Sequence, residues 1–293
     1  MKYVRRPTGC VIRASGRDSL SFLQGMLTND VRAADNALGQ TAFHLDSKGS
    51  VIFPVTIYTC SDAIYLDVEG ETSDVVMNAL EKYLVMERCK LECATKTQSG
   101  VWVYGDLLSM PKHPFTALGG GHVYETSLGT ESLLAMQQRR SDQPMWLIFG
   151  SSQALNLLFD ELGAIEMPVE WADELRISAG IPAGTQDFSG MLAMETGVVE
   201  RTIAFNKGCY IGQEVVARID SRGKTHRSLY VIDVEGAVGL DKVIYCDDKV
   251  VGDIRSASTV DGATKAIARL RSDAISSHLT VNGVPVNRIR MVQ

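Results

Sequence analysis

Residues 207–218 of this 293-residue chain read KGCYIGQEVVAR, within a stretch that concentrates the features that folding alone explains least. Val215 and Val216, followed by Ile219, have the spacing of an apolar helical face, whereas the glycines before them are typical of a loop. The pattern predicts a loop that enters a helix. Cys209 is predicted to lie in that loop.

The position of Cys209 suggests a reactive sulfur. A cysteine at a helix entry meets the positive end of the helix dipole, and Lys207 stands two residues away; both influences favour the thiolate. The alternative is that Cys209 is a small buried residue at a tight turn, with Gly208 and Gly212 present only for their backbone angles. Spacing alone does not separate these two interpretations.

Other chemical signals in the sequence are weak. A cysteine hydrolase would need a histidine as its base, and none of the five histidines lies in a recognisable catalytic signature, so this class is disfavoured. The five are His44, His113, His122, His226 and His278. No glycine-rich phosphate loop and no dinucleotide-binding glycine motif occurs. Residues 222–227 read RGKTHR, a basic run more typical of a solvated domain junction than of an anion-binding site, which is the alternative.

Composition excludes several classes of protein. A net charge of −6 argues against a protein whose main task is to bind nucleic acid. We expect a cytosolic protein without membrane contact, because no apolar run is long enough to cross a bilayer. The six cysteines are sparse, which predicts reduced thiols. Cys89 and Cys93 stand four apart, but we interpret them as buried strand residues because no second ligand pair follows.

Hydrophobic periodicity predicts an α+β protein followed by a small β-barrel. The helices are expected at residues 18–27, 72–86, 152–161 and 168–179. Strands are expected at residues 40–46, 50–59, 63–68, 91–95, 101–104 and 146–149, and the barrel strands at 228–234, 242–246, 249–257 and 279–291. Residues 111–129, which include Gly119-Gly120-Gly121, are predicted to form a surface loop.

The signature at 207–214 resembles the defining motif of the YgfZ family, distant relatives of the glycine-cleavage T-protein. Supporting blocks occur in the family's order along nearly the whole chain, except residues 102–143. They read GRD at 16–18, FLQG at 22–25, LTNDV at 27–31, LRI at 175–177 and GIP at 180–182, with the hairpin of residues 45–58 turning at Gly49 and with Val251-Gly252 and Ser256-Ala257 in the barrel.

The resemblance implies a ring of two ferredoxin-like α+β domains and a β-barrel around a central channel. Residues 1–225 would hold the two intertwined α+β domains and residues 226–293 the barrel. The channel would bind tetrahydrofolate or a one-carbon derivative. The partners implied are iron-sulfur client or assembly proteins, including radical enzymes that modify tRNA, and a transient iron-sulfur cluster is a further expectation.

The resemblance also assigns site residues. Cys209 matches the functional cysteine of the family's motif. The other members of the motif are Lys207, Gly208, Tyr210, Gly212, Gln213 and Glu214. Glu195 and Arg218 are expected to contact folate, with a solvated acid as the alternative for Glu195. No metal ligands are assigned. Ser178 replaces a glutamate of the T-proteins, so aminomethyl transfer is doubtful.

Three functions follow from these expectations. The first is a folate-binding accessory factor for iron-sulfur proteins, with Cys209 at the rim of the folate cavity. The second is a folate-dependent aminomethyltransferase-like enzyme. The third is a folate-binding scaffold that docks client proteins and performs no chemistry.

Overall fold

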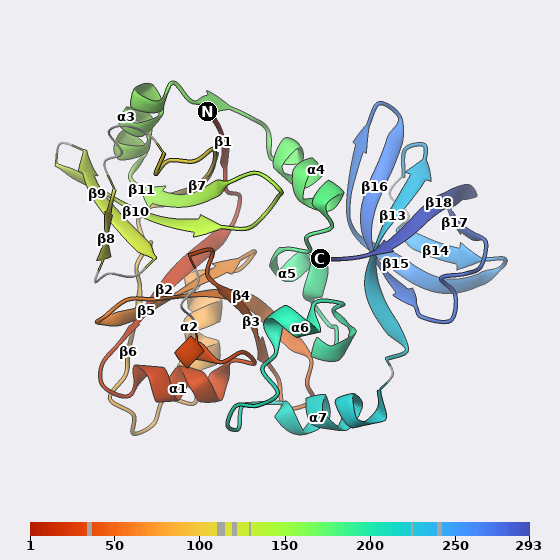
Figure 1. The fold of residues 1–293 in the computed structure, drawn as a ribbon, viewed down its shortest axis with the longest axis horizontal. Helices are drawn as coiled ribbons and strands as arrows, with labels where there is room; N and C mark the ends of the chain where they lie inside the picture. Colours follow the sequence, from red (N-terminus) through yellow and green to blue (C-terminus); the bar gives the residue numbers. More distant parts are fainter. Residues whose placement is uncertain (34–36, 110–114, 119–121, 129, 224, 239–241) are drawn as a thin grey trace.

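The computed structural model describes residues 1–293 except 34–36, 110–114, 119–121, 129, 224 and 239–241. A first sheet has the strand order β3 (Gln40–Leu45), β4 (Val51–Thr59), β5 (Ala63–Glu69), β2 (Gly9–Ser15) and β6 (Lys90–Cys93). Helices α1 (Ser19–Met26) and α2 (Ser73–Glu81) cover one face of it (Figure 1). Phe22, Leu23, Val76 and Leu80 of these helices share a core with the strands, because both helices present an apolar stripe.

A second sheet packs against the other face of the first. Its order is β12 (Ile165–Glu166), β1 (Lys2–Arg5), β7 (Ser99–Tyr104), β11 (Met145–Gly150), β10 (Glu131–Gln138), β9 (Val123–Leu128) and β8 (Thr116–Ala117). Helix α3 (Ser152–Leu162) covers its outer face through Leu155 and Leu158. The chain starts in this sheet, enters the first sheet and returns, so the two α+β units are interleaved.

A string of short helices follows: α4 (Val169–Ala179), α5 (Gly184–Phe188), the 3-10 turn Ala193–Glu195, α6 (Val199–Thr202) and α7 (Gln213–Arg222). These elements lie between the two sheets and the C-terminal barrel (Figure 1). Their buried side chains join the first sheet to the barrel in one core, which includes Phe43, Ile177, Tyr210, Val216 and Val231. The signature segment is therefore part of the junction that holds the protein together.

The C-terminal strands form a closed barrel. Its order is β13 (Arg227–Glu235), β16 (Ala263–Arg271), β15 (Lys249–Val260), β14 (Val243–Cys246), β17 (Leu279–Val281) and β18 (Val284–Met291), and β18 pairs with β13 to close it. The turn between β17 and β18 lies at Asn282 and Gly283, where both residues have positive φ. The predicted α+β class with a C-terminal barrel is confirmed, whereas the boundary at residue 225 stays a prediction.

Three expectations about elements were wrong. Strand β9 occupies part of the predicted loop 111–129, because Val123 and Thr126 point into the core between polar residues; Gly119-Gly120-Gly121 lie outside the described residues. The helix predicted to reach residue 86 ends at Glu81, and Val85 and Met86 are 82% and 90% exposed. Strands β1, β2, β10, β12 and β16 were not predicted. Along the described chain, no helix combines the length and apolar character needed to span a bilayer.

Candidate functional site

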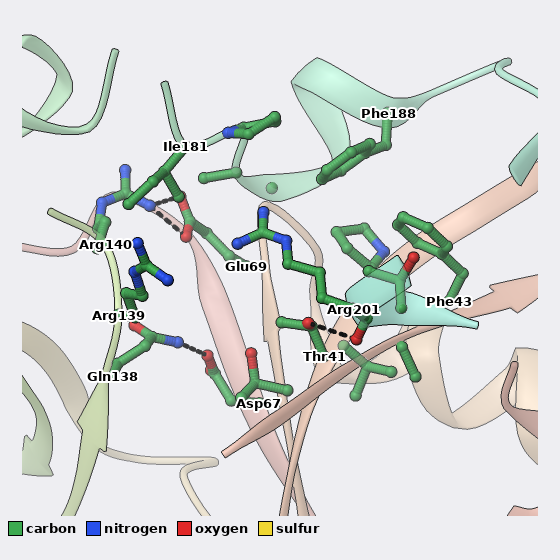
Figure 2. Close-up of a pocket in the computed structure, with 18 residues that line it drawn as sticks. Thr41, Phe43, Asp67, Glu69, Gln138, Arg139, Arg140, Ile181, Phe188 and Arg201 are labelled. Atoms are coloured by element: carbon green, nitrogen blue, oxygen red, sulfur yellow. Dashed lines mark hydrogen bonds and ion pairs between the residues drawn. The ribbon is translucent and has the colours of Figure 1, made fainter. Parts of the chain in front are cut away.

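A cavity lies where the two sheets meet the connecting helices, and its space together with the open solvent at its mouth amounts to about 610 Å³. Strands β3, β4 and β5 supply one wall, the end of β10 another, and residues 181–188 and 201–202 close it (Figure 2). The lining residues that carry polar or aromatic groups are Phe43, Asp67, Glu69, Gln138, Arg139, Arg140, Phe188 and Arg201.

Two carboxylates in this wall are already paired with arginines. Asp67 accepts from Arg6 Nη1 at 2.7 Å and from Gln138 Nε2 at 2.7 Å. Burial raises the pKa of Asp67, and the charge of Arg6 opposes that rise. Glu69 accepts from Arg140, whose guanidinium also lies 3.9 Å from the centre of the Trp102 ring. These pairs tie the first sheet to the second beside the cavity.

Arg201 and Arg139 differ from the paired arginines. The Nε atom of Arg201 is buried without a partner, and burial, followed by repulsion from Arg139, lowers the pKa of Arg201 to about 10. Arg139 is exposed and donates to the side-chain oxygen of Gln293 at 3.2 Å. Both side chains point into the cavity from opposite sides (Figure 2).

The remaining wall is apolar and aromatic. Phe43 and Phe188 pack edge to face with their ring centres 5.1 Å apart, and Pro54, Val55 and Ile181 complete the surface. Gln138 also lines the cavity, and its Oε1 atom is buried without a partner. An aromatic and apolar wall of this kind can pack against a planar ring.

The signature segment is anchored outside this cavity by Lys207. Its Nζ atom donates to the carbonyl oxygens of Gln24, Leu27 and Asn29 at 2.8, 2.6 and 2.8 Å. These carbonyls lie in and just after the C-terminal part of α1, where helix carbonyls lack intrahelical partners. Burial lowers the pKa of Lys207 to about 8, with an opposing influence from Asp30.

Gly212 allows the signature segment to pack closely against the turn between β3 and β4. It has φ +82°, and a Cβ atom there would lie 2.6 Å from the carbonyl oxygen of Asp46. Gly49 of that turn, with φ +79°, faces Val215. Only glycine allows this approach without strain. Gly208 is different, because a Cβ atom on it would meet nothing within 4 Å.

Cys209 is exposed, and α7 begins only at Gln213. Two expectations about it need correction. All three N–H groups of Lys207 are used on backbone carbonyls, so this residue anchors the loop instead of activating the sulfur. Cys209 also lies three residues before the N-cap Gly212, beyond the first turn over which a helix dipole acts. Cys209 does not line this cavity, and its position at the rim of a folate site stays a prediction.

The other predicted site residues are scattered. Gln213 accepts from the Tyr210 backbone at 3.3 Å and thereby shapes the loop. Glu214 and Arg218 form an exposed ion pair at 2.8 Å on α7, and Glu195 is half-buried in the 3-10 turn. Neither Glu195 nor Arg218 lines the cavity. Their contact with folate stays a prediction that the geometry of this cavity does not support.

Sequence reasoning missed the charged residues of the cavity. Asp67 and Glu69 lie at the end of a strand that is otherwise apolar, and Arg139-Arg140 directly follow another strand. These charges beside apolar strands were the signal available in the sequence. The basic run 222–227 lies between α7 and β13, and Lys224 is outside the described residues, as is His113. In the described part of the chain, no group of three His, Cys, Asp or Glu residues is placed to hold a metal ion.

The fold defines the class of protein. The crystal structure of the glycine cleavage system aminomethyltransferase T from Bartonella henselae superposes with a TM-score of 0.80, covering 100% of this chain and 84% of that protein at 12% identity. The chain thus has an aminomethyltransferase-like fold.

Sequence relatives narrow the class. The protein named tRNA-modifying protein YgfZ of Colwellia psychrerythraea is 23% identical over 82% of this chain and 72% of its own length. The YgfZ protein of Yersinia pestis (strain Pestoides F) is 23% identical over 94% of this chain and 89% of its own. An uncharacterized protein of Haemophilus influenzae is 26% identical over 86% of this chain and 82% of its own length. No family model matches. These relatives confirm the resemblance to YgfZ.

Proposed function

We propose that this protein is a folate-binding accessory factor that supports iron-sulfur proteins, including enzymes that modify tRNA. The observation that carries the proposal is the cavity at the junction of an aminomethyltransferase-like fold. Its residues suit a folate: Phe43 and Phe188, which contact each other, can pack against one side of the pterin ring, and the unpartnered side-chain oxygen of Gln138 is the acceptor we propose for an N–H on the ring edge. The relatives named as tRNA-modifying proteins support the client class.

Cys209 acts apart from the folate in this proposal. It lies on an exposed loop that Lys207 anchors, and the loop leaves the cavity wall at Arg201 and Thr202. The backbone between them is fixed by Thr28, which donates to the Thr202 carbonyl oxygen at 2.6 Å. An exposed sulfur on an anchored loop is placed to meet a client protein or its cluster. The cavity would hold folate while Cys209 contacts the client.

The fold likeness to an aminomethyltransferase favours a second candidate, a folate-dependent transferase. Ser178 weighs against it, because its hydroxyl accepts from Lys265 of the barrel at 3.5 Å and does not line the cavity. A glycine-cleavage assay with lipoyl carrier separates the two, since only a transferase turns over. We expect no turnover.

The test of the proposal is calorimetric titration of tetrahydrofolate, under anaerobic reducing conditions, into the wild-type protein and Cys209→Ala. We expect equal, saturable binding to both, because Cys209 does not line the cavity. In cells that lack their own YgfZ protein, Cys209→Ala should fail to restore iron-sulfur-dependent tRNA modification. No binding to the wild type would refute the folate role, and full restoration by Cys209→Ala would leave a scaffold.

A further inference from the structure

Arg201 and Arg139 are the charged groups of the cavity that form no ion pair in the described part of the chain. Asp67 is paired with Arg6, and Glu69 with Arg140. Across the described residues, neither Arg201 nor Arg139 forms an ion pair with a carboxylate, and Arg201 Nε is buried without any partner. Two cations therefore face a space whose carboxylates, Asp67 and Glu69, are already paired with other arginines.

Such an arrangement is unfavourable for the ligand-free protein. The Arg201 side chain is half-buried, its Nε atom is removed from water without an acceptor, and the nearby charge of Arg139 adds repulsion. Groups that cost stability in this way are characteristic of binding sites, where the ligand supplies the missing partner.

We propose that Arg139 and Arg201 form an anion subsite that binds a carboxylate of the cavity's ligand. This inference rests on the proposed folate function, and in a folate the matching groups are the carboxylates of the glutamyl tail. A guanidinium presents parallel N–H donors to a carboxylate, and two converging guanidinium groups can grip both of its oxygens. The protein is thereby selective for folates that carry the tail.

The placement of the two arginines orients the ligand. Arg201 lies within the cavity, whereas Arg139 is exposed and bonded to the C-terminal residue Gln293. The ring system then occupies the apolar wall at Phe43 and Phe188, and the tail extends past Arg201 to the opening at Arg139. Further γ-linked glutamates would continue into solvent, so polyglutamylated folates fit without rearrangement.

The first experiment compares tetrahydrofolate with tetrahydropteroate, which has the same rings without the glutamate. For the wild type, we expect tetrahydrofolate to bind roughly 10- to 100-fold more tightly, as charged hydrogen bonds predict. Arg201→Gln should remove this difference while still binding tetrahydropteroate. The matched control is Arg17→Gln, at an exposed arginine just before α1 that does not line the cavity. This variant should keep the wild-type difference in affinity between the two ligands.

The outcomes separate this inference from the proposed function. Equal wild-type affinities for the two ligands would overturn the anion subsite and leave folate binding intact. If neither ligand binds, p-aminobenzoylglutamate, which carries the tail without the pterin, becomes the probe in a thermal-shift assay. Stabilisation of the wild type but not of Arg201→Gln would support the subsite without folate. No stabilisation of either would overturn both.

A ligand-free measurement tests whether Arg201 has a merely structural role. We expect Arg201→Met to melt at the same or a higher temperature than the wild type, because it removes an unpaired charge. Arg140→Met is the control and should melt lower, because it leaves Glu69 without its partner and removes the contact with Trp102. A melting temperature of Arg201→Met several degrees below the wild type would overturn the inference.

Discussion

The Nζ atom of Lys207 lies 2.6 Å from the carbonyl oxygen of Leu27, across 180 residues of sequence. The same ammonium reaches the carbonyls of Gln24 and Asn29, so one side chain collects three acceptors at the end of α1. Two sequence blocks that carry the family resemblance, residues 22–31 and 207–214, are therefore in direct contact. Lys207 fixes the loop that presents Cys209.

Replacement of Lys207 tests this anchoring. Lys207→Met keeps the length of the side chain but leaves three carbonyls without their charged donor. We expect the free energy of unfolding to fall by about 2 kcal/mol, measured by urea denaturation. Lys48→Met, at the exposed tip of the β3–β4 hairpin, is the control and should change stability little. Equal stability of the two variants would contradict the anchoring role.

Gly212 and Gly208 form a second matched pair. Gly212→Ala should destabilise the protein by about 1 to 3 kcal/mol, because its Cβ atom would clash with the Asp46 carbonyl and its φ is positive. Gly208→Ala should stay within about 0.5 kcal/mol of the wild type, because its Cβ atom meets open space. Urea unfolding of both variants measures this.

The same pair has a functional readout. If the open side of Gly208 faces a client protein, Gly208→Ala should impair restoration of tRNA modification in cells while its stability remains that of the wild type. Normal restoration by this variant would show that the client does not approach the loop at Gly208.

The sequence predicted the elements whose patterns are local. The helix at 19–26 has its apolar face in the spacing of Phe22, Leu23 and Met26, and the β3–β4 hairpin alternates through Val51, Phe53 and Val55. Strands β9 and β16 were missed because their polar residues, such as Glu125 and Lys265, dilute the apolar alternation. Their pairing with neighbours across the sheet decides their conformation.

The candidate site was predictable in only one of its two parts. The signature loop is contiguous, so its motif could be recognised from residues 207–214. The cavity is assembled from Glu69, Arg140 and Arg201, which come from three separate segments. Neither the contact of Glu69 with Arg140 nor the lack of a partner at Arg201 leaves a local pattern in the sequence, because both depend on how the sheets pack.

His44 makes the stability depend on pH. It is fully buried, with Nδ1 3.0 Å from the Met26 carbonyl oxygen and Nε2 without a partner. Burial, with a smaller effect of Lys82, lowers the pKa of His44 below the 6.5 of an unfolded histidine. The unfolded chain therefore binds a proton first as the pH falls below 6.5, and the folded state loses stability there.

We expect the free energy of unfolding of the wild type to fall between pH 7.5 and 5.5 more steeply than that of His44→Gln. The exposed His278→Gln is the control and should keep the wild-type slope. Parallel slopes for all three proteins would show that His44 is not the group responsible.

Cys209 should be the first thiol to react with iodoacetamide in the folded protein. It is the exposed cysteine, whereas Cys10 is buried and the other four are half-buried. Burial also raises the pKa of Cys10 to about 12, which suppresses its thiolate. Mass spectrometry of partially labelled protein should find the label at Cys209 before the other sites. Saturating tetrahydrofolate should leave the rate unchanged, because the sulfur lies outside the cavity wall, and strong protection by the ligand would instead place Cys209 beside the bound folate.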